Sequence, residues 1–271
     1  MFVIFPFAWM FSSSFKPESE MMSIEPKWIP NNPTIKNYLW VLGISTETDE
    51  RSAVSKTLGL KVFFKNSIIV SGFTCLIVWL FSILGGFSLA RFSFRGKRFL
   101  GLLFLMTTFF PLVLMLVPFY IVLSRMRLID TYTGLIFVMS ATCTPFCVWM
   151  MKGFISSIPI ELEECATVDG CTRIGAFLKI TLPLIKSGSV ATLAYTFITT
   201  WGAFIQPLII STSDQTKQIS IGLSELVGWY GQTNWGGLLA GSVTTALPVA
   251  LAFMVFQKFL VQGMTLGAVK E

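Results

Sequence analysis

Four long stretches almost free of charged side chains constrain the fold of this chain more than any other feature. A helix needs about 20 apolar residues to cross the roughly 30 Å hydrocarbon core of a bilayer. Stretches of that length cover 67–89, 99–124, 187–210 and 238–260, and a slightly shorter one covers 133–151. Because lipid cannot satisfy backbone polar groups, we expect an all-α fold, a polytopic bundle of transmembrane helices.

The composition supports this class. Hydrophobic residues make up 54% of the chain and charged residues only 13%, which is typical of an integral protein of the lipid bilayer. The net charge of +6 comes from basic residues beside the apolar stretches, so we expect it to set orientation and not to bind nucleic acid. Histidine, the commonest general base, is absent, and we expect no catalytic site.

The five cysteines predict neither a disulfide framework nor a metal site. All fall in apolar stretches or in a connection that we place in the cytoplasm, so we interpret them as small apolar fillers. Cys143 and Cys147 share a helical face, but no histidine and no nearby acid could complete a metal site. We expect no cofactor.

Charge and length predict the organisation along the chain. The run 1–14 is too short to cross a bilayer, and we interpret it as part of a first transmembrane helix whose beginning is missing. We then expect a periplasmic segment at 15–60, a transmembrane core at 61–260 and a cytoplasmic tail at 261–271. Basic residues crowd the connections at 91–98 and 152–187, which places both in the cytoplasm together with the C-terminus.

The apolar stretches also limit the mechanism. Ion-coupled carriers and channels usually hold acids or charged rings within the membrane, and none of these stretches contains an acid. The sequence therefore disfavours an ion-coupled secondary carrier, which we keep as the less favoured alternative function. Prolines within the stretches predict kinked helices around a path, or reflect the ordinary proline content of membrane helices: Pro111, Pro118, Pro145, Pro207 and Pro248.

The connection 152–187 contains a polar, helix-turn-helix-like insert. Ser156 or Ser157 can cap a helix over 158–169, acids complement its first turn, and Gly170 supplies a left-handed stop. Thr172 can cap a second helix that ends before Pro183. On the first helix Leu162, Cys165 and Ala166 form a face that invites a partner, although the insert could instead pack on its own membrane helices.

The insert resembles the EAA motif of permease subunits in bacterial ATP-binding cassette importers. Glu164, Ala166 and Gly170 match the motif, as do Ile180, Leu182 and Pro183 after nine residues, with Cys165 in place of the usual alanine. Further segments such as ARFSFRGK at 90–97, DTYTGLI at 130–136 and GMTLGAVK at 263–270 resemble the carbohydrate-importer branch, and especially the smaller membrane subunit of the maltose transporter. The resembling segments cover nearly the whole chain in order.

The resemblance implies a type I importer permease of six helices in the bacterial inner membrane. It implies as partners a second permease, two ATPase subunits and a periplasmic solute-binding protein. The first helix of the insert would be the coupling helix that docks on an ATPase subunit. Its positions are occupied here by Glu161, Glu164, Ala166, Asp169 and Gly170. ATP would be cleaved by the partners, since the chain has no GxxxxGK[ST] phosphate-binding loop.

The resemblance makes two further predictions. The tail, with Gly263, Thr265, Gly267 and Lys270, would reach the ATPase dimer, and its glycines suit an extended peptide. Trp201 and Gln206 are candidates for the solute path, although an aromatic residue in a membrane helix is more often a packing residue or an interface anchor. Relatives often carry Asn and an acid directly after this tryptophan, where this chain has glycine and alanine, so a maltose-like solute does not follow. A carbohydrate is expected; a polyol or glycerol phosphate is the alternative.

Overall fold

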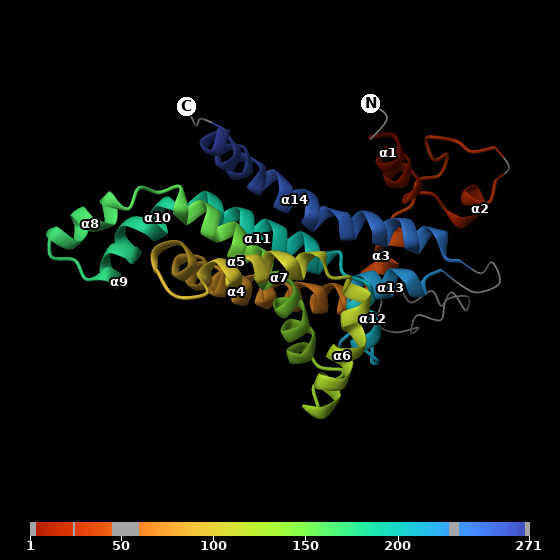
Figure 1. Ribbon diagram of the computed structural model, residues 1–271. Coiled ribbons are helices and arrows are strands. Elements are labelled where there is room, and N and C mark those ends of the chain that lie inside the picture. Colours follow the sequence, from red (N-terminus) through yellow and green to blue (C-terminus); the bar gives the residue numbers. More distant parts are fainter. Residues whose placement is uncertain (1–3, 24, 45–59, 228–232, 269–271) are drawn as a thin grey trace. The chain divides into compact units, whose positions relative to one another are not determined.

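The computed structural model describes residues 4–23, 25–44, 60–227 and 233–268, with side chains as far as Gln257. Within these ranges the regular structure is entirely helical (Figure 1). The elements are α1 (Ile4–Ser13), α2 (Glu18–Met21), α3 (Lys36–Val41), α4 (Lys61–Arg91), α5 (Lys97–Phe109), α6 (Leu112–Arg125), α7 (Tyr132–Ser156), α8 (Glu161–Val168), α9 (Arg173–Ala176), the π-helix η1 (Phe177–Thr181), α10 (Leu182–Leu184), α11 (Lys186–Trp201), α12 (Ile205–Ile210), α13 (Ile219–Glu225) and α14 (Trp235–Ala268).

The expected helical membrane bundle is confirmed as a class. Three described helices are long and apolar enough to cross a membrane: α4, α7 and the part of α14 over Trp235–Gln257. The number of candidate spans rises to 5 if each of two bent helix pairs is one span, and α1 is a shorter apolar helix.

Two of the predicted spans are broken, which corrects the sequence analysis. The stretch 99–124 divides into α5 and α6, which bend by 102° around Phe110 and Pro111. Phe110 is extended, as the residue before a proline usually is, and Pro111 has no N–H to continue the helix. The stretch 187–210 ends its first helix at Trp201, and α12 begins only at Ile205. By contrast, Pro118, Pro145 and Pro248 lie inside continuous helices.

The chain divides into two compact units. Unit 1 contains Met1–Ile69, Asp130–Tyr132 and Trp201–Leu251; unit 2 contains Val70–Ile129, Thr133–Thr200 and Ala252–Glu271. In unit 1, α14 is approached closely by the segment before α4: a Cβ on Gly236 would lie 2.4 Å from the Asn37 side chain, and one on Gly237 would lie 2.7 Å from the Trp40 ring.

The core of unit 2 forms where α4, α7 and the start of α11 meet. Ile83, Met151, Ile155 and Ile185 are buried together. A Cβ on Gly86 would lie 2.9 Å from the Met151 side chain and 3.0 Å from the Lys152 backbone nitrogen, so α4 and α7 can approach this closely only with glycine there. A second buried group, Val78 with Cys143 and Cys147, agrees with the interpretation of these cysteines as apolar fillers.

Candidate functional site

The polar insert forms a bent elbow, which we define as α8, α9, η1 and α10. In Figure 1 it extends from the ends of α7 and α11, all within unit 2. Helix α8 carries three acids in its first turn and ends at Val168, and Gly170 follows with a φ of 86°, in the left-handed region. The Cys171 N–H then donates to the Ala166 carbonyl at 2.9 Å. The predicted glycine stop is therefore confirmed.

The start of the elbow differs from the prediction. Helix α8 begins at Glu161 and has no side-chain cap, because Ser156 still belongs to α7 and the Ser157 hydroxyl donates back to the Phe154 carbonyl at 2.8 Å. These serines finish one helix and do not start the next. The cap predicted at Thr172 is confirmed, since its Oγ1 accepts from the Gly175 N–H at 3.1 Å.

The second helix of the elbow is not a uniform α-helix. After one turn of α9 the backbone widens into η1, in which Leu182 N–H bonds back to the Phe177 carbonyl. Pro183 follows in the first turn of α10, where its missing N–H is tolerated. Leu182 packs against the buried cluster of unit 2, Ile180 is half-buried and Pro183 is exposed.

Most of α8 is open to a partner. Glu161, Leu162, Glu164, Cys165, Asp169 and Gly170 are exposed, whereas Ala166 is buried, which corrects the predicted face. Val168, with 87% of its surface accessible, and Ile174, with 72%, are exposed on either side of the Gly170 turn. We call Leu162, Cys165, Val168 and Ile174 the tip surface. The insert thus turns one face of this helix, with Glu163 and Ala166, inward and leaves the rest exposed.

The elbow is held to α4 by an ion pair that the sequence analysis missed. Arg91 Nε lies 2.7 Å from Glu163 Oε1, and both side chains are largely buried. Beside this pair is a hollow of about 330 Å³ whose lining includes Phe87, Arg173 and Ala176. The spacing places Glu163 on the same face as Ala166, three residues later, but only the structure shows that this face is the inward one.

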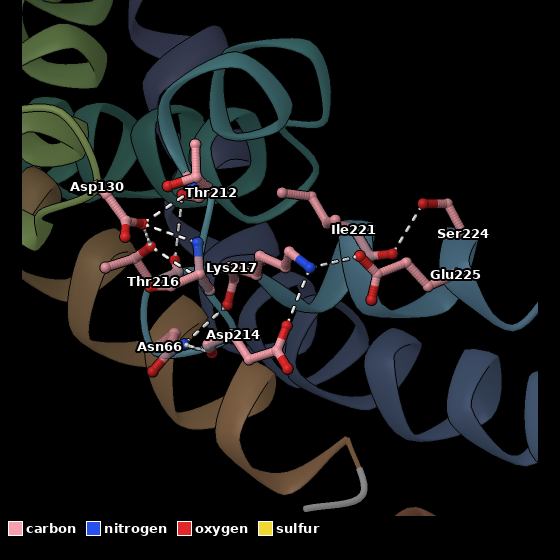
Figure 2. A network of polar contacts seen from close by, with 11 residues as sticks. Asn66, Asp130, Thr212, Asp214, Thr216, Lys217, Ile221, Ser224 and Glu225 are labelled. Carbon is pink, nitrogen blue, oxygen red and sulfur yellow. Dashed lines mark hydrogen bonds and ion pairs between the residues drawn. The ribbon is translucent and has the colours of Figure 1, made fainter. Parts of the chain in front are cut away.

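A second polar cluster lies in unit 1 and orders the loop 211–218 between α12 and α13. Figure 2 shows Asp130 facing Thr212 and Thr216, and Lys217 between Asp214 and Glu225. Asp130 Oδ1 accepts from the Thr212 and Ser213 N–H groups at 3.0 and 3.1 Å, and also from the Thr216 hydroxyl. Burial alone would raise the pKa of Asp130, but these hydrogen bonds outweigh it and hold the pKa well below its usual range.

Further contacts tie this loop to the start of α4. Asn66 Nδ2 donates to the Lys217 carbonyl at 2.8 Å, and Tyr132 donates to Asn66 Oδ1 at 2.6 Å. Lys217 bonds Asp214 at 2.9 Å and Glu225 at 2.7 Å. Burial would lower the pKa of Lys217, but these two carboxylates outweigh it and raise the pKa.

The residues proposed for a solute path are buried in unit 1. Trp201 is only 2% exposed; its Nε1 donates to the Thr245 carbonyl at 3.1 Å and its ring meets Phe64 edge to face. Gln206 is 6% exposed. In this conformation neither side chain offers a surface on which a solute could stack.

The predicted tail is helical where it is described. Helix α14 continues to Ala268, so Gly263, Thr265 and Gly267 lie in helical backbone and not in an extended peptide. The Thr265 side chain and the whole of Lys270 lie outside what the structure describes.

Comparison with known proteins establishes the family. Residues 82–266 match the binding-protein-dependent transport system inner membrane component family. The chain belongs to this family. The match includes the whole elbow, so the EAA-like insert lies within a membrane component of a transport system and is not an isolated motif.

Individual relatives are similar to this chain in sequence over almost its full length. The diacetylchitobiose uptake system permease protein of Streptomyces coelicolor is 30% identical over 99% of this chain and 92% of its own length. The arabinooligosaccharides transport system permease protein of Halalkalibacterium halodurans is 32% identical over 98% and 91%. The trehalose/maltose transport system permease protein of Thermococcus litoralis is 27% identical over 98% and 91%. This chain is therefore a transport permease with several membrane-spanning helices.

A solved structure shows the same fold. A chain of a bacterial transporter that imports the acidic polysaccharide alginate superimposes with a TM-score of 0.78, covering 95% of this chain and 91% of that one. Only 18% of the residues are identical, so the likeness concerns the fold and not the solute.

Proposed function

We propose that this protein is the translocation subunit of an ATP-driven carbohydrate importer and that its elbow docks on an ATPase subunit. The observation that carries the proposal is the tip surface. Strongly exposed apolar side chains lie on both sides of the left-handed Gly170, Val168 at the end of α8 and Ile174 in α9, and the acids of α8 are exposed as well. Exposed apolar patches rimmed by polar residues are typical of protein–protein interfaces.

The remaining partners follow from the family. A second permease would complete the path, two ATPase subunits would cleave ATP, and a periplasmic solute-binding protein would deliver the solute, leaving this subunit non-catalytic. The elbow and the C-terminus would face the cytoplasm, in agreement with the basic residues around 91–98 and 152–187. Closure of the ATPase dimer would then move the elbow as a rigid body and rock the attached helices.

The solute class is proposed from the relatives, whose names refer to diacetylchitobiose, arabinooligosaccharides and trehalose or maltose. Trp201 and Gln206 would belong to the solute path only if another conformation of unit 1 uncovers them. The tail from Gly263 to Lys270 would approach the ATPase dimer as a continuation of α14.

Co-purification tests the docking. The chain is expressed with the ATPase and permease encoded beside its gene, and the ATPase retained on the tagged chain is measured. The double variant Leu162→Asp/Val168→Asp should lose the ATPase, because it introduces charge into an apolar contact. Val227→Asp is the matched control: Val227 is 52% exposed and belongs to unit 1, outside the residues of the elbow.

If both variants retained the ATPase equally, the elbow would not be part of the interface with the ATPase. The purified wild-type chain alone should hydrolyse no ATP. Hydrolysis by material free of ATPase subunits would contradict the proposed division of labour. The solute class is tested separately, by binding of oligosaccharides, polyols and glycerol phosphate to the solute-binding protein encoded alongside.

A further inference from the structure

Glu163 differs from the other acids of the elbow. Glu161 and Glu164 are exposed, whereas only 14% of the Glu163 side chain is accessible. Its partner Arg91 is similarly covered, at 10%. A carboxylate and a guanidinium are rarely buried this far unless they are paired with each other, and removing one leaves the other uncompensated.

The Glu163 carboxylate joins three elements of unit 2. Its Oε1 accepts from Arg91 at the end of α4 at 2.7 Å and from the Thr181 hydroxyl at the end of η1 at 2.8 Å. Arg91 also donates through Nη2 to the carbonyl of Ile158, just before α8, at 2.9 Å. We call Arg91, Glu163 and Thr181 the joint. The Arg91 guanidinium thus bonds both the Glu163 side chain in the first turn of α8 and the Ile158 backbone just before it.

The other contacts around the joint are apolar and less directional. Phe87 of α4 meets Phe177 of η1 with ring centroids 4.7 Å apart, and Ala166 and Ala176 are buried nearby. Aromatic and alanine contacts tolerate sliding, whereas a charge-assisted hydrogen bond fixes both distance and direction. The joint is therefore the feature that sets the position of α8 relative to the end of α4.

We propose that the joint transmits displacement of α8 to α4. This rests on the proposed function, because an ATPase subunit would supply the displacement. Arg91, Glu163 and Thr181 then act as positioning residues, and Glu164 beside them stays free for the partner. Without the joint, movement of α8 would be absorbed at η1, since a π-helical turn is a common site of local rearrangement, and α4 would stay in place.

Hydrogen–deuterium exchange on the assembled transporter tests this without knowing the solute. The complex of both permeases and the ATPase subunits is compared without nucleotide and with Mg-ATP plus vanadate. In the wild type we expect nucleotide-dependent exchange changes both at 161–168 and at 84–91. In Glu163→Gln the change at 161–168 should remain and the change at 84–91 should be lost. Once binding to the solute-binding protein has identified the solute, uptake per ATP hydrolysed should also be roughly tenfold lower in this variant, the usual order of an allosteric coupling.

Two further variants separate transmission from folding. The double variant Arg91→Met/Glu163→Met removes both charges and should fold, because apolar replacement of a buried pair is often neutral for stability. It should still lose the response at 84–91. Arg95→Met is the matched control, since it removes an exposed cation of the same connection, and it should behave as the wild type.

The outcomes distinguish the two proposals. If both joint variants keep the wild-type response at 84–91, the joint does not transmit and this inference is wrong, while docking of the elbow stands. If the wild type itself shows no nucleotide-dependent change at 161–168, the failure lies in the proposed docking. Thr181→Val, which removes one of the two hydrogen bonds on Glu163 Oε1, should weaken the response at 84–91 only in part.

Discussion

The elbow and the 211–218 loop are both polar connections between apolar helices, yet they are held in opposite ways. The loop is fixed along its length by Asp130, Asn66 and Lys217, which bond several of its backbone and side-chain groups. The elbow exposes most of α8, and its directional contacts to α4 converge on Arg91, which pairs with Glu163 and donates to the Ile158 carbonyl. Many fixed points keep a segment in one shape, whereas a single directional joint lets a segment move as a unit. The comparison indicates a static part and a lever.

Replacing Asp130 by Ala should have the largest effect, and it tests whether the 211–218 loop is held static by its polar contacts. It removes the acceptor of three hydrogen bonds and places alanine at a φ of 57°, so the free energy of opening the 211–218 loop should fall by about 3 kcal/mol. Amides in the loop should then exchange roughly a hundredfold faster in hydrogen–deuterium exchange. Asp130→Asn keeps an acceptor and tolerates the backbone, so it should lose far less. Unchanged exchange in the alanine variant would show that the loop is held by other contacts.

Replacing Gly170 by Val tests the lever. Valine at a φ of 86° costs about 2 kcal/mol, and the elbow can relieve this strain only by redirecting α8. Insertion into the membrane should be normal, while solute-stimulated ATP hydrolysis and uptake should be uncoupled. Gly96 offers a matched control, with a φ of 89° and, like Gly170, no atom within 4 Å of an added Cβ. Gly96→Val carries the same strain outside the elbow and should transport normally; equal loss in both variants would contradict a special role of the elbow.

How far the sequence predicted these two regions depends on the range of the interactions. The apolar stretches, the glycine stop and the cap at Thr172 are local patterns and were predicted. The pairing of Arg91 with Glu163 joins residues 72 apart, and that of Asp130 with Thr212 joins residues 82 apart. No local pattern fixes such partners, and Ala166, on the same face as Glu163, was expected from the sequence to face a partner.

The broken spans were missed for a different reason. Hydropathy measures whether a segment prefers lipid, and it does not register that Pro111 cannot continue a hydrogen-bonded helix. Pro145 and Pro248 lie inside continuous helices, so proline alone did not predict which span would break. The second break lies at 202–204, before α12, and there Ser220 donates to the Ala203 carbonyl at 2.6 Å from a distant segment. Such compensation depends on tertiary structure.

Acid should affect the loop less than loss of the Asp130 side chain. The folded-state pKa of Asp130 lies below its unfolded value of about 4, so its stabilising effect is complete above that value and is lost as pH falls through the lower, folded pKa. Exchange of loop amides, corrected for intrinsic rates, should be constant from pH 7 to about 5 and should rise only in stronger acid. In Asp130→Asn this acid dependence should be absent. A rise already near pH 6 would point to another titrating group.

The smallest expected effect concerns the turn between α8 and α9. Thr172→Ala removes the hydroxyl that caps α9, which should destabilise that turn by about 1 kcal/mol, while Thr172→Ser should keep the cap. Because the joint and not the cap positions α8, the alanine variant should speed exchange at 173–176 but leave the exchange of 161–168 nearly unchanged. If 161–168 lost protection to the same extent, α8 and α9 would open together. The elbow would then be a single cooperative piece rather than a helix positioned by its own joint.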